Sequence, residues 1–160
     1  MLSQKLSATL AIVVAMGTAS MAMAGACPAD QVLSTPRDIE EIAPAGLLRE
    51  VLGNVRLEGW RDMGGFLLRM RRITVAPGGF VPTHGHADRP TIIYIVDGEI
   101  IEHNTDCGVP IVHKVGESTT EFGPTYNAWW ENKGDTPVVL ISTDVLPYEG
   151  KAEPYVGIEK

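Results

Sequence analysis

The stretch that decides the fold is "PGGFVPTHGHADRPTIIYIVDGE", Pro77 to Glu99. It opens with turn-forming proline and glycine, carries two of the chain's four histidines at His84 and His86, and continues as a β-branched run. Residues two apart on a strand point to the same side, so both imidazoles would face one way. Imidazole is a common metal ligand, and the question is which other residues would complete a site.

Short strand-like runs, separated by turn residues, continue on both sides of this stretch. Residues 66–79 predict a strand that ends at Pro77 and the two glycines after it, and residues 91–103 predict two strands joined as a hairpin at Asp97-Gly98. Further strands are predicted over 109–118 and around a turn at residues 133–135, whereas residues 46–55 fit a short helix or a strand. The pattern predicts an all-β chain forming a single antiparallel barrel or sandwich, which can enclose one small ligand.

The N-terminal residues have the character of a targeting segment. Lys5 is followed by an uncharged run of apolar and small residues up to Ala24, with an A-x-A pattern ending at Ala24 or Ala26. This predicts a secretory signal peptide over residues 1–26, cleaved after Ala24 or Ala26, rather than a membrane anchor. A lipoprotein would use Cys27, but Ala24 stands where such signals usually have leucine. We therefore expect a periplasmic or secreted protein with no stable membrane anchor after cleavage.

The two cysteines and the charge bound the chemistry further. Cys27 and Cys107 are the chain's only cysteines, and an exported protein usually pairs an even number of them, although two free thiols are the alternative. The chain carries a net charge of −7 at pH 7. Its only basic cluster, Arg69 to Arg72, alternates with a strand pattern and is expected to be a solvated strand face. Nucleic acid is therefore excluded as an expected partner.

The opening stretch resembles the first sequence motif of the cupin superfamily, G-x5-H-x-H-x4-E-x6-G. Gly78, His84, His86 and Gly98 fall on that spacing, and Thr91 stands at the position of the glutamate. The resemblance implies an antiparallel jelly-roll barrel over residues 65–147. An N-terminal arm with the first strands would precede it over 27–64, and a polar tail would follow over 148–160.

A second resemblance lies further along the chain. The second cupin motif, roughly G-x5-P-x-G-x2-H-x3-N, matches at Gly116 and at Asn132, and its histidine falls on Ala128 or, counted from Gly116, near Asn127. More closely, the chain is similar to small exported bacterial cupins that share "CPA", "H-x-HADRP", "PIVHK-G" and "WW-N-G", from Cys27 to about residue 146. The resemblance also implies that a homodimer can form.

A cupin metal site resembles three histidines and one glutamate around Fe, Mn, Ni or Zn, with positions left open for water or substrate. Here His84 and His86 match, while Thr91 replaces the glutamate and Ala128 replaces the third histidine. Two imidazoles alone rarely hold a first-row ion tightly, so we expect a degenerate metal site. Asn127, His103 or His113 could supply a replacement ligand, because the sequence does not show where these residues lie relative to the two histidines.

The barrel cavity is expected to be mostly apolar. Strand alternation turns Thr91 and Ile93 toward the histidines and Tyr94 away from them, and it turns Trp130 inward with Trp129 outside. Asp88 and Arg89 are expected to form a local ion pair at the barrel mouth, with a substrate clamp by Arg89 as the alternative. The candidate ligand-binding residues are Thr91, Ile93, Tyr94, Asn127 and Trp130.

Two functions follow for testing. The first is an exported cupin that binds a small, largely apolar or aromatic molecule in its barrel and holds metal weakly or not at all. The alternative is a metal-dependent, dioxygenase-like oxidoreductase that uses His84 and His86. A metal-independent isomerase or lyase with one histidine as general base, and a structural or partner-binding role, are further hypotheses.

Overall fold

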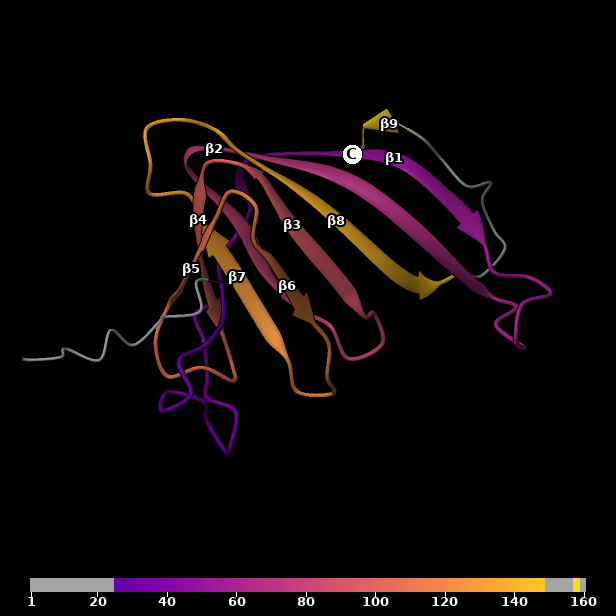
Figure 1. Ribbon diagram of the computed structural model, residues 1–160, viewed down its shortest axis with the longest axis horizontal. Coiled ribbons are helices and arrows are strands. Elements are labelled where there is room, and N and C mark those ends of the chain that lie inside the picture. The colour runs from indigo at the N-terminus through magenta and orange to yellow at the C-terminus, as the bar shows by residue number, and fades with distance from the viewer. Residues whose placement is uncertain (1–24, 149–156, 159–160) are drawn as a thin grey trace, which may run out of the picture.

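The computed structural model describes residues 25–148 and 157–158, so the predicted signal peptide up to Ala24 lies outside the described residues. The described chain is all-β, and its strands pair in antiparallel fashion (Figure 1). Within these residues, no helix has the length and apolar character needed to cross a membrane. The strands are β1 (Ala45–Arg56), β2 (Phe66–Gly85), β3 (Thr91–Asp97), β4 (Glu99–Asn104), β5 (Ile111–Lys114), β6 (Ser118–Glu121), β7 (Asn127–Glu131), β8 (Val138–Pro147) and β9 (Gly157–Ile158).

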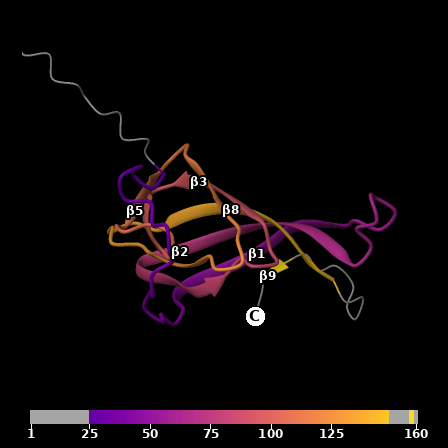
Figure 2. The same cartoon turned by 90° about the horizontal axis from the view of Figure 1, so that it is seen from below.

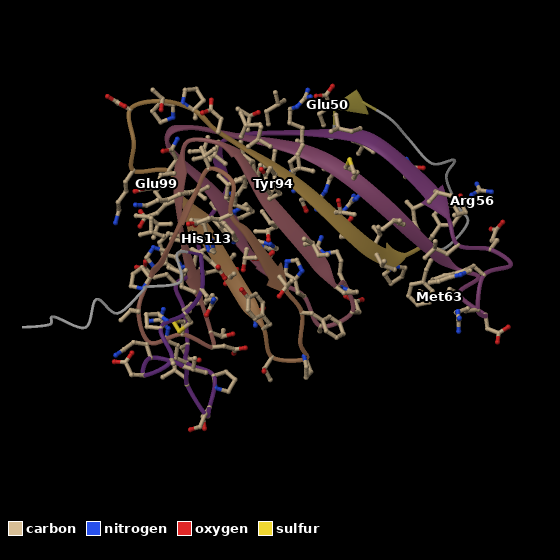
Figure 3. All side chains as sticks on the ribbon, viewed as in Figure 1. Glu50, Arg56, Met63, Tyr94, Glu99 and His113 are labelled. Atoms are coloured by element: carbon tan, nitrogen blue, oxygen red, sulfur yellow. A yellow bond between two sulfur atoms is a disulfide. The ribbon has the colours of Figure 1, made fainter. Side chains whose placement is uncertain are left out.

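The strands form one nine-stranded sheet with the order β5-β4-β7-β2-β8-β3-β6, and β1 lies between β2 and β9 beside this path. The sheet curls so that β5 contacts β3, which nearly closes it into the antiparallel barrel that the sequence predicts. Residues 46–55, which fitted either a helix or a strand, belong to β1. The long β1–β2 hairpin extends beyond the barrel, with Met63 in its connecting loop (Figures 2 and 3).

The prediction that a strand ends at Pro77 is wrong, because β2 continues through it to Gly85. Its pairing with β1 jumps from Val75 to Phe80, so the residues between them form a bulge. A Cβ atom on Gly79 would lie 2.8 Å from two backbone oxygens, so the chain can bend this tightly only at glycine. Asn132 fixes the bulge, since its Nδ2 donates to the carbonyl of Val75 at 3.0 Å. Past the bulge, β2 exchanges its partner β8 for β7 and turns the corner of the barrel.

The predicted hairpin at Asp97-Gly98 is also wrong. The strands on either side pair with different neighbours: β3 with β6 and β8, and β4 with β5 and β7. Gly98 has a φ of 82°, and a Cβ atom there would lie 2.8 Å from Cγ2 of Val138. The same two turn residues that favour a hairpin therefore make a corner, where the chain crosses from one side of the barrel to the other.

The barrel interior follows the alternation predicted for β3. Thr91, Ile93 and Ile95 are buried, whereas Ile92 and Tyr94 are exposed on the outer face. The buried apolar cluster comes mainly from β2, β3, β7 and β8. Its members are Ile73, Val75, Ile93, Ile95, Ile100, Tyr126, Ala128, Trp130, Val138 and Leu140.

The basic cluster on β2 is not the solvated face that was expected. Arg69 and Arg71 point inward, with side chains only 13% and 8% exposed, and both donate to the buried carboxylate of Asp144. Arg72 alone faces solvent, where it pairs with Glu50. The reason is strand alternation combined with a buried anion on β8, since Asp144 lies directly opposite Arg69 in the β2–β8 register.

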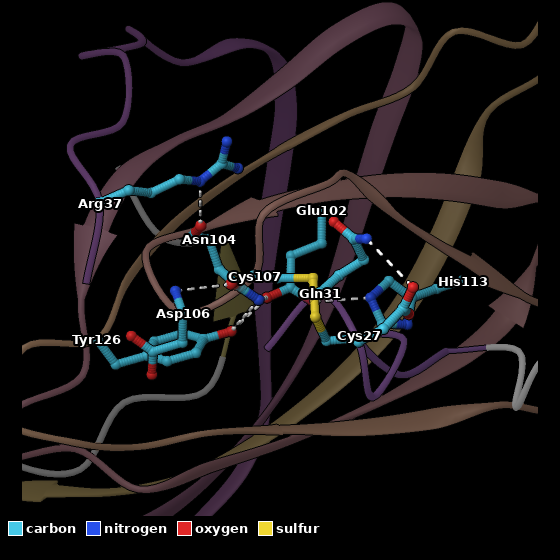
Figure 4. Close-up of a disulfide and its surroundings, with 10 residues drawn as sticks. Cys27, Gln31, Arg37, Glu102, Asn104, Asp106, Cys107, His113 and Tyr126 are labelled. Atoms are coloured by element: carbon cyan, nitrogen blue, oxygen red, sulfur yellow. Dashed lines mark hydrogen bonds and ion pairs between the residues drawn. A yellow bond between two sulfur atoms is a disulfide. The ribbon is translucent and has the colours of Figure 1, made fainter. Parts of the chain in front are cut away.

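The disulfide between Cys27 and Cys107 is present, as the sequence predicts (Figure 4). It holds the N-terminal arm against the loop between β4 and β5. The arm adds backbone hydrogen bonds there, from Leu33 to the carbonyl of Asp106 and from Gly108 to that of Gln31. The arm is thus a fixed cover over one end of the barrel.

Candidate functional site

Three ligand atoms converge at one mouth of the barrel. His84 lies at the end of β2, His86 directly follows that strand, and Glu121 is the last residue of β6. One ligand atom from each residue lies within 4.8 Å of the others. His86 and Glu121 are almost fully buried, whereas the side chain of His84 is 25% exposed at the mouth.

The backbone orients both imidazoles toward this point. His84 Nδ1 lies 2.8 Å from the carbonyl of Pro82, and His86 Nδ1 lies 2.9 Å from that of Arg89. A carbonyl only accepts hydrogen bonds, so both Nδ1 atoms carry a proton, and in the neutral form of each ring Nε2 presents its lone pair to this point. Metal-binding histidines are typically held in this way, with the second ring nitrogen donating to a carbonyl or carboxylate.

Glu121 completes the cluster. Its Oε1 accepts a hydrogen bond from Trp130 Nε1 at 3.0 Å, which turns Oε2 toward the histidines. Oε2 lies 3.0 Å from His86 Nε2 and 4.0 Å from His84 Nε2. Burial by itself would raise the pKa of Glu121, but the close approach of His86 and the nearby imidazole of His84 hold that pKa below its usual value.

These atoms fit a bound cation. His86 Nε2 and Glu121 Oε2 are both buried, and neither has a hydrogen bond of good geometry despite their 3.0 Å separation. A lone pair on nitrogen facing a carboxylate is repulsive unless a proton or a metal ion lies between them. Burial also lowers the pKa of His84, which favours the neutral form that a metal requires.

Sequence reasoning missed Glu121, although the cross-strand register explains its place. Glu121 on β6 lies directly opposite Thr91 on β3, the position where the motif has its glutamate. The carboxylate is therefore supplied from the neighbouring strand. Thr91 instead supports the site, since its hydroxyl lies 3.0 Å from His86 Nδ1 and donates to the carbonyl of Arg89. The candidate metal position thus has a carboxylate beside the two predicted histidines.

The other proposed ligands lie elsewhere. Ala128 is opposite His84 in the β2–β7 pairing and contributes only packing. His103 pairs with Glu131 at 2.8 Å and stacks on Trp129, which lies outside the cavity as expected. Asn127 is exposed and donates to a loop carbonyl, away from the cavity.

A cavity of about 100 Å³ opens beside the three ligand atoms. Pockets for drug-sized ligands are about 300 to 1,000 Å³, so this one suits a molecule of a few heavy atoms. Of the candidate ligand-binding residues, Thr91, Ile93 and Trp130 line it, whereas Tyr94 and Asn127 do not. Apolar side chains form much of the wall, namely Leu47, Ile73, Val81, Ile93, Trp130 and Leu140.

The cavity is more basic than the sequence indicates. Arg49, Arg71 and Arg89 all line it. The expected local pairing of Arg89 with Asp88 is replaced by an approach to Asp144, whose Oδ2 lies 4.0 Å from Arg89 Nε. The largely apolar cavity that was expected therefore has a cationic side.

A second buried polar cluster lies behind Trp130, toward the disulfide (Figure 4). The carboxylate of Glu102 accepts hydrogen bonds from Tyr126 and Asn104, and it lies 2.7 Å from His113 Nε2. The His113 ring stacks on Trp130, with 4.7 Å between ring centroids. His113 is thus held away from His84 and His86, and it supports the indole that orients Glu121.

Comparison with known proteins finds similarity at the level of the fold. No protein-family model matches the sequence, and no curated protein matches it either. Among solved structures, a protein of Bacillus halodurans is 12% identical over 69% of this chain and 76% of its own, with a TM-score of 0.53. A cupin-2 domain from Rhodospirillum rubrum is 14% identical over 76% of this chain and 72% of its own, with a TM-score of 0.52. A cupin-2 domain of an XRE-family transcriptional regulator from Enterobacter cloacae is 16% identical over 64% of this chain and 99% of its own, with a TM-score of 0.48.

Proposed function

We propose that this protein, which has the fold of the cupin superfamily, binds a divalent transition-metal ion through His84, His86 and Glu121 and acts on a small molecule in the adjoining cavity. The observation that carries the proposal is the convergence of three lone-pair-bearing atoms within 4.8 Å, each oriented by a second contact. When bound, such an ion supplies an electrophilic or redox centre with open positions for a ligand.

The ligand set favours the metal-dependent oxidoreductase over the other reaction classes. Two histidines and one carboxylate on one side of an ion, with the remaining positions open, are typical of non-haem iron(II) oxygenases. In this chain Trp130 and Thr91 hold the ligands, and much of the adjoining cavity wall is apolar. Fe is therefore the first candidate among Fe, Mn, Ni and Zn.

A metal-free binding protein is the second candidate, and one observation favours it. His86 Nε2 and Glu121 Oε2 approach to 3.0 Å, so a protonated imidazole and a carboxylate could pair directly. The cavity would then bind its ligand without an ion.

Metal analysis decides between the two candidates. Untagged protein should retain about one equivalent of transition metal after dialysis, and Glu121→Gln should lose it. Glu117→Gln is the matched control, because Glu117 directly precedes β6 and its carboxylate accepts a hydrogen bond from the backbone N–H of Lys114. Metal-free wild-type protein that also fails to take up added iron(II) or zinc would support the metal-free binding protein.

The proposed setting is an oxidising compartment outside the cytoplasm. The disulfide and the predicted signal peptide both support export. Cell fractionation followed by N-terminal sequencing should find a chain that begins at Gly25 or Cys27. A full-length chain in the cytosol would contradict export without affecting the metal proposal.

A further inference from the structure

The buried polar cluster behind Trp130 contains one atom without a partner. His113 is fully buried, and its Nε2 lies 2.7 Å from Glu102 Oε2. A carboxylate only accepts hydrogen bonds, so Nε2 carries a proton, and in the neutral form of the ring Nδ1 presents its lone pair. Within the part of the chain that the structure describes, His113 Nδ1 has no hydrogen-bond partner. A buried polar atom of this kind is costly to leave unpaired, so we expect a donor beside it.

Gly25 is the residue that lies beside this atom. It is buried, whereas Ala26 after it is exposed. A Cβ atom on Gly25 would lie 3.3 Å from His113 Nδ1 and 3.1 Å from Glu117 Oε2. The backbone N–H of Gly25 donates to the carbonyl of Val112, at 3.3 Å. Three acceptors therefore surround one glycine, and its amide nitrogen has a single hydrogen to donate.

An α-ammonium group at Gly25 fits these acceptors better than an amide does, because it carries three N–H donors and a positive charge. As the first residue of a chain, Gly25 would have nothing attached to its nitrogen, and rotation about its Cα–C bond could bring that nitrogen to the Cβ position described above. There it would lie 3.1 Å from Glu117 Oε2 and 3.3 Å from His113 Nδ1, at or close to hydrogen-bonding distance. The carboxylate of Glu117 would supply the opposite charge.

We infer that the predicted signal peptide is cleaved between Ala24 and Gly25, and that the new α-ammonium group binds to His113 and Glu117. The inference rests on the proposed export of this protein and is independent of the proposed metal site. Hydrolysis by a signal peptidase consumes one water molecule and breaks the bond between the carbonyl carbon of Ala24 and the nitrogen of Gly25. The hydroxyl of water stays on that carbon, and both the other hydrogen and the proton of the new carboxyl group end on the nitrogen. Cleavage after Ala26, which the A-x-A pattern also allows, would remove Gly25 and leave the acceptors without this donor.

The test uses the chain that begins at Gly25, released from an N-terminal fusion by a protease that leaves no extra residue. This chain keeps every residue that the structure describes. Acetylation of its α-amino group by an N-hydroxysuccinimide ester at neutral pH is followed by mass spectrometry of the N-terminal peptide. A synthetic peptide of residues 25–30, with its thiol blocked, gives the rate of an open amine. The bound ammonium should react at least about tenfold more slowly than the peptide, because its hydrogen bonds to a charged group must break first.

Glu117→Gln removes the opposite charge and should raise the acetylation rate of Gly25 about tenfold. Glu121→Gln is the matched control, because it makes the same chemical change at the end of β6, where the carboxylate faces His86. Urea unfolding checks that both variants are folded. Glu121→Gln should lose metal and leave the acetylation rate unchanged, whereas Glu117→Gln should keep metal and react faster. The two proposals can therefore fail separately.

N-terminal sequencing of the protein from the periplasmic fraction tests the cleavage position, and the chain should begin at Gly25. A chain that begins at Cys27, or one that keeps its signal peptide, would overturn the assigned cleavage. A wild-type acetylation rate within about twofold of the peptide would overturn the binding of the ammonium group. Equal rates in Glu117→Gln and Glu121→Gln would overturn it as well.

Discussion

Replacing Trp130 with phenylalanine tests whether the indole orients the carboxylate of the proposed metal site. Trp130 is 1% exposed, and its Nε1 donates to Glu121 Oε1 at 3.0 Å. Phenylalanine keeps an aromatic ring for stacking on His113 but removes the donor. Glu121 would then keep its charge with one hydrogen bond fewer in a buried environment, and its side chain would be free to rotate.

The expected loss follows from that single bond. A hydrogen bond to a charged group is worth about 1.5 to 3 kcal/mol. Contacts that orient a metal ligand typically change affinity by about 10- to 100-fold, which is about 1.4 to 2.8 kcal/mol. The two estimates agree, so Trp130→Phe should weaken metal affinity by about 10- to 100-fold.

Zinc provides a redox-inert probe for the measurement, with affinity read by competition against a chromophoric chelator. Trp129→Phe is the matched control, since it makes the same chemical change in the next residue, whose ring stacks on His103 outside the cavity. Urea unfolding of both variants separates lost packing from lost affinity. Zinc affinity of Trp130→Phe within about twofold of wild type, in a folded protein, would refute the orienting role of the indole.

Three further predictions concern stability. The disulfide joins residues 80 apart, so Cys107→Ser should lower the free energy of unfolding by about 4.5 kcal/mol in the chain-entropy model, measured by urea titration. Asp144→Asn should cost about 3 to 5 kcal/mol in the same assay, because it removes the buried charge to which Arg69 and Arg71 both donate. Burial alone would raise the pKa of Glu131, but the contacts with Lys133 and His103 hold that pKa below 4.5. The stability that this carboxylate contributes is therefore present above pH 4.5 and is lost as the pH falls through the lowered pKa. Glu131→Gln should remove this acid-sensitive part of the stability.

Each stability prediction has an outcome that contradicts it. Wild-type protein treated with reductant should match Cys107→Ser, and equal stability with and without reductant would show that the cross-link does not constrain the unfolded chain. Glu50→Gln removes an exposed partner of Arg72 and should cost no more than about 1 kcal/mol. If Asp144→Asn lowers the free energy of unfolding by no more than Glu50→Gln does, the buried arginines find another anion. An unchanged acid limb of the pH–stability curve in Glu131→Gln would contradict the role given to that carboxylate.

The sequence predicts the strands and their inward faces well, because strand alternation is a local property. The burial of Thr91, Ile93 and Ile95 follows directly from the period of two. The corners were predicted wrongly, since Pro77 and Gly98 are turn-favouring in isolation while the partner strands decide what the turn becomes. A hairpin and a barrel corner use the same dipeptide, so local sequence does not distinguish them.

The charged interior was missed for a related reason. Arginine on a strand is usually exposed, and only the presence of Asp144 opposite Arg69 makes an inward position favourable. These residues are 75 positions apart in the chain. A signal was present, however, because Arg69 and Arg71 share the strand parity of Ile73, which is an inward residue.

The absence of a glutamate at position 91 shows that a motif on one strand does not identify every ligand of a site. A metal site requires an oxygen at a point in space, and that point can be reached from either of two paired strands about 4.8 Å apart. Glu121 reaches it from β6, and Thr91 takes over the orientation of His86 through the carbonyl of Arg89. Exchanging the two side chains, as Thr91→Glu with Glu121→Thr, should therefore preserve zinc binding better than Glu121→Thr alone. Equal loss in the single and double variants would mean that Trp130, whose indole N–H donates to the carboxylate of Glu121, fixes the carboxylate position to β6.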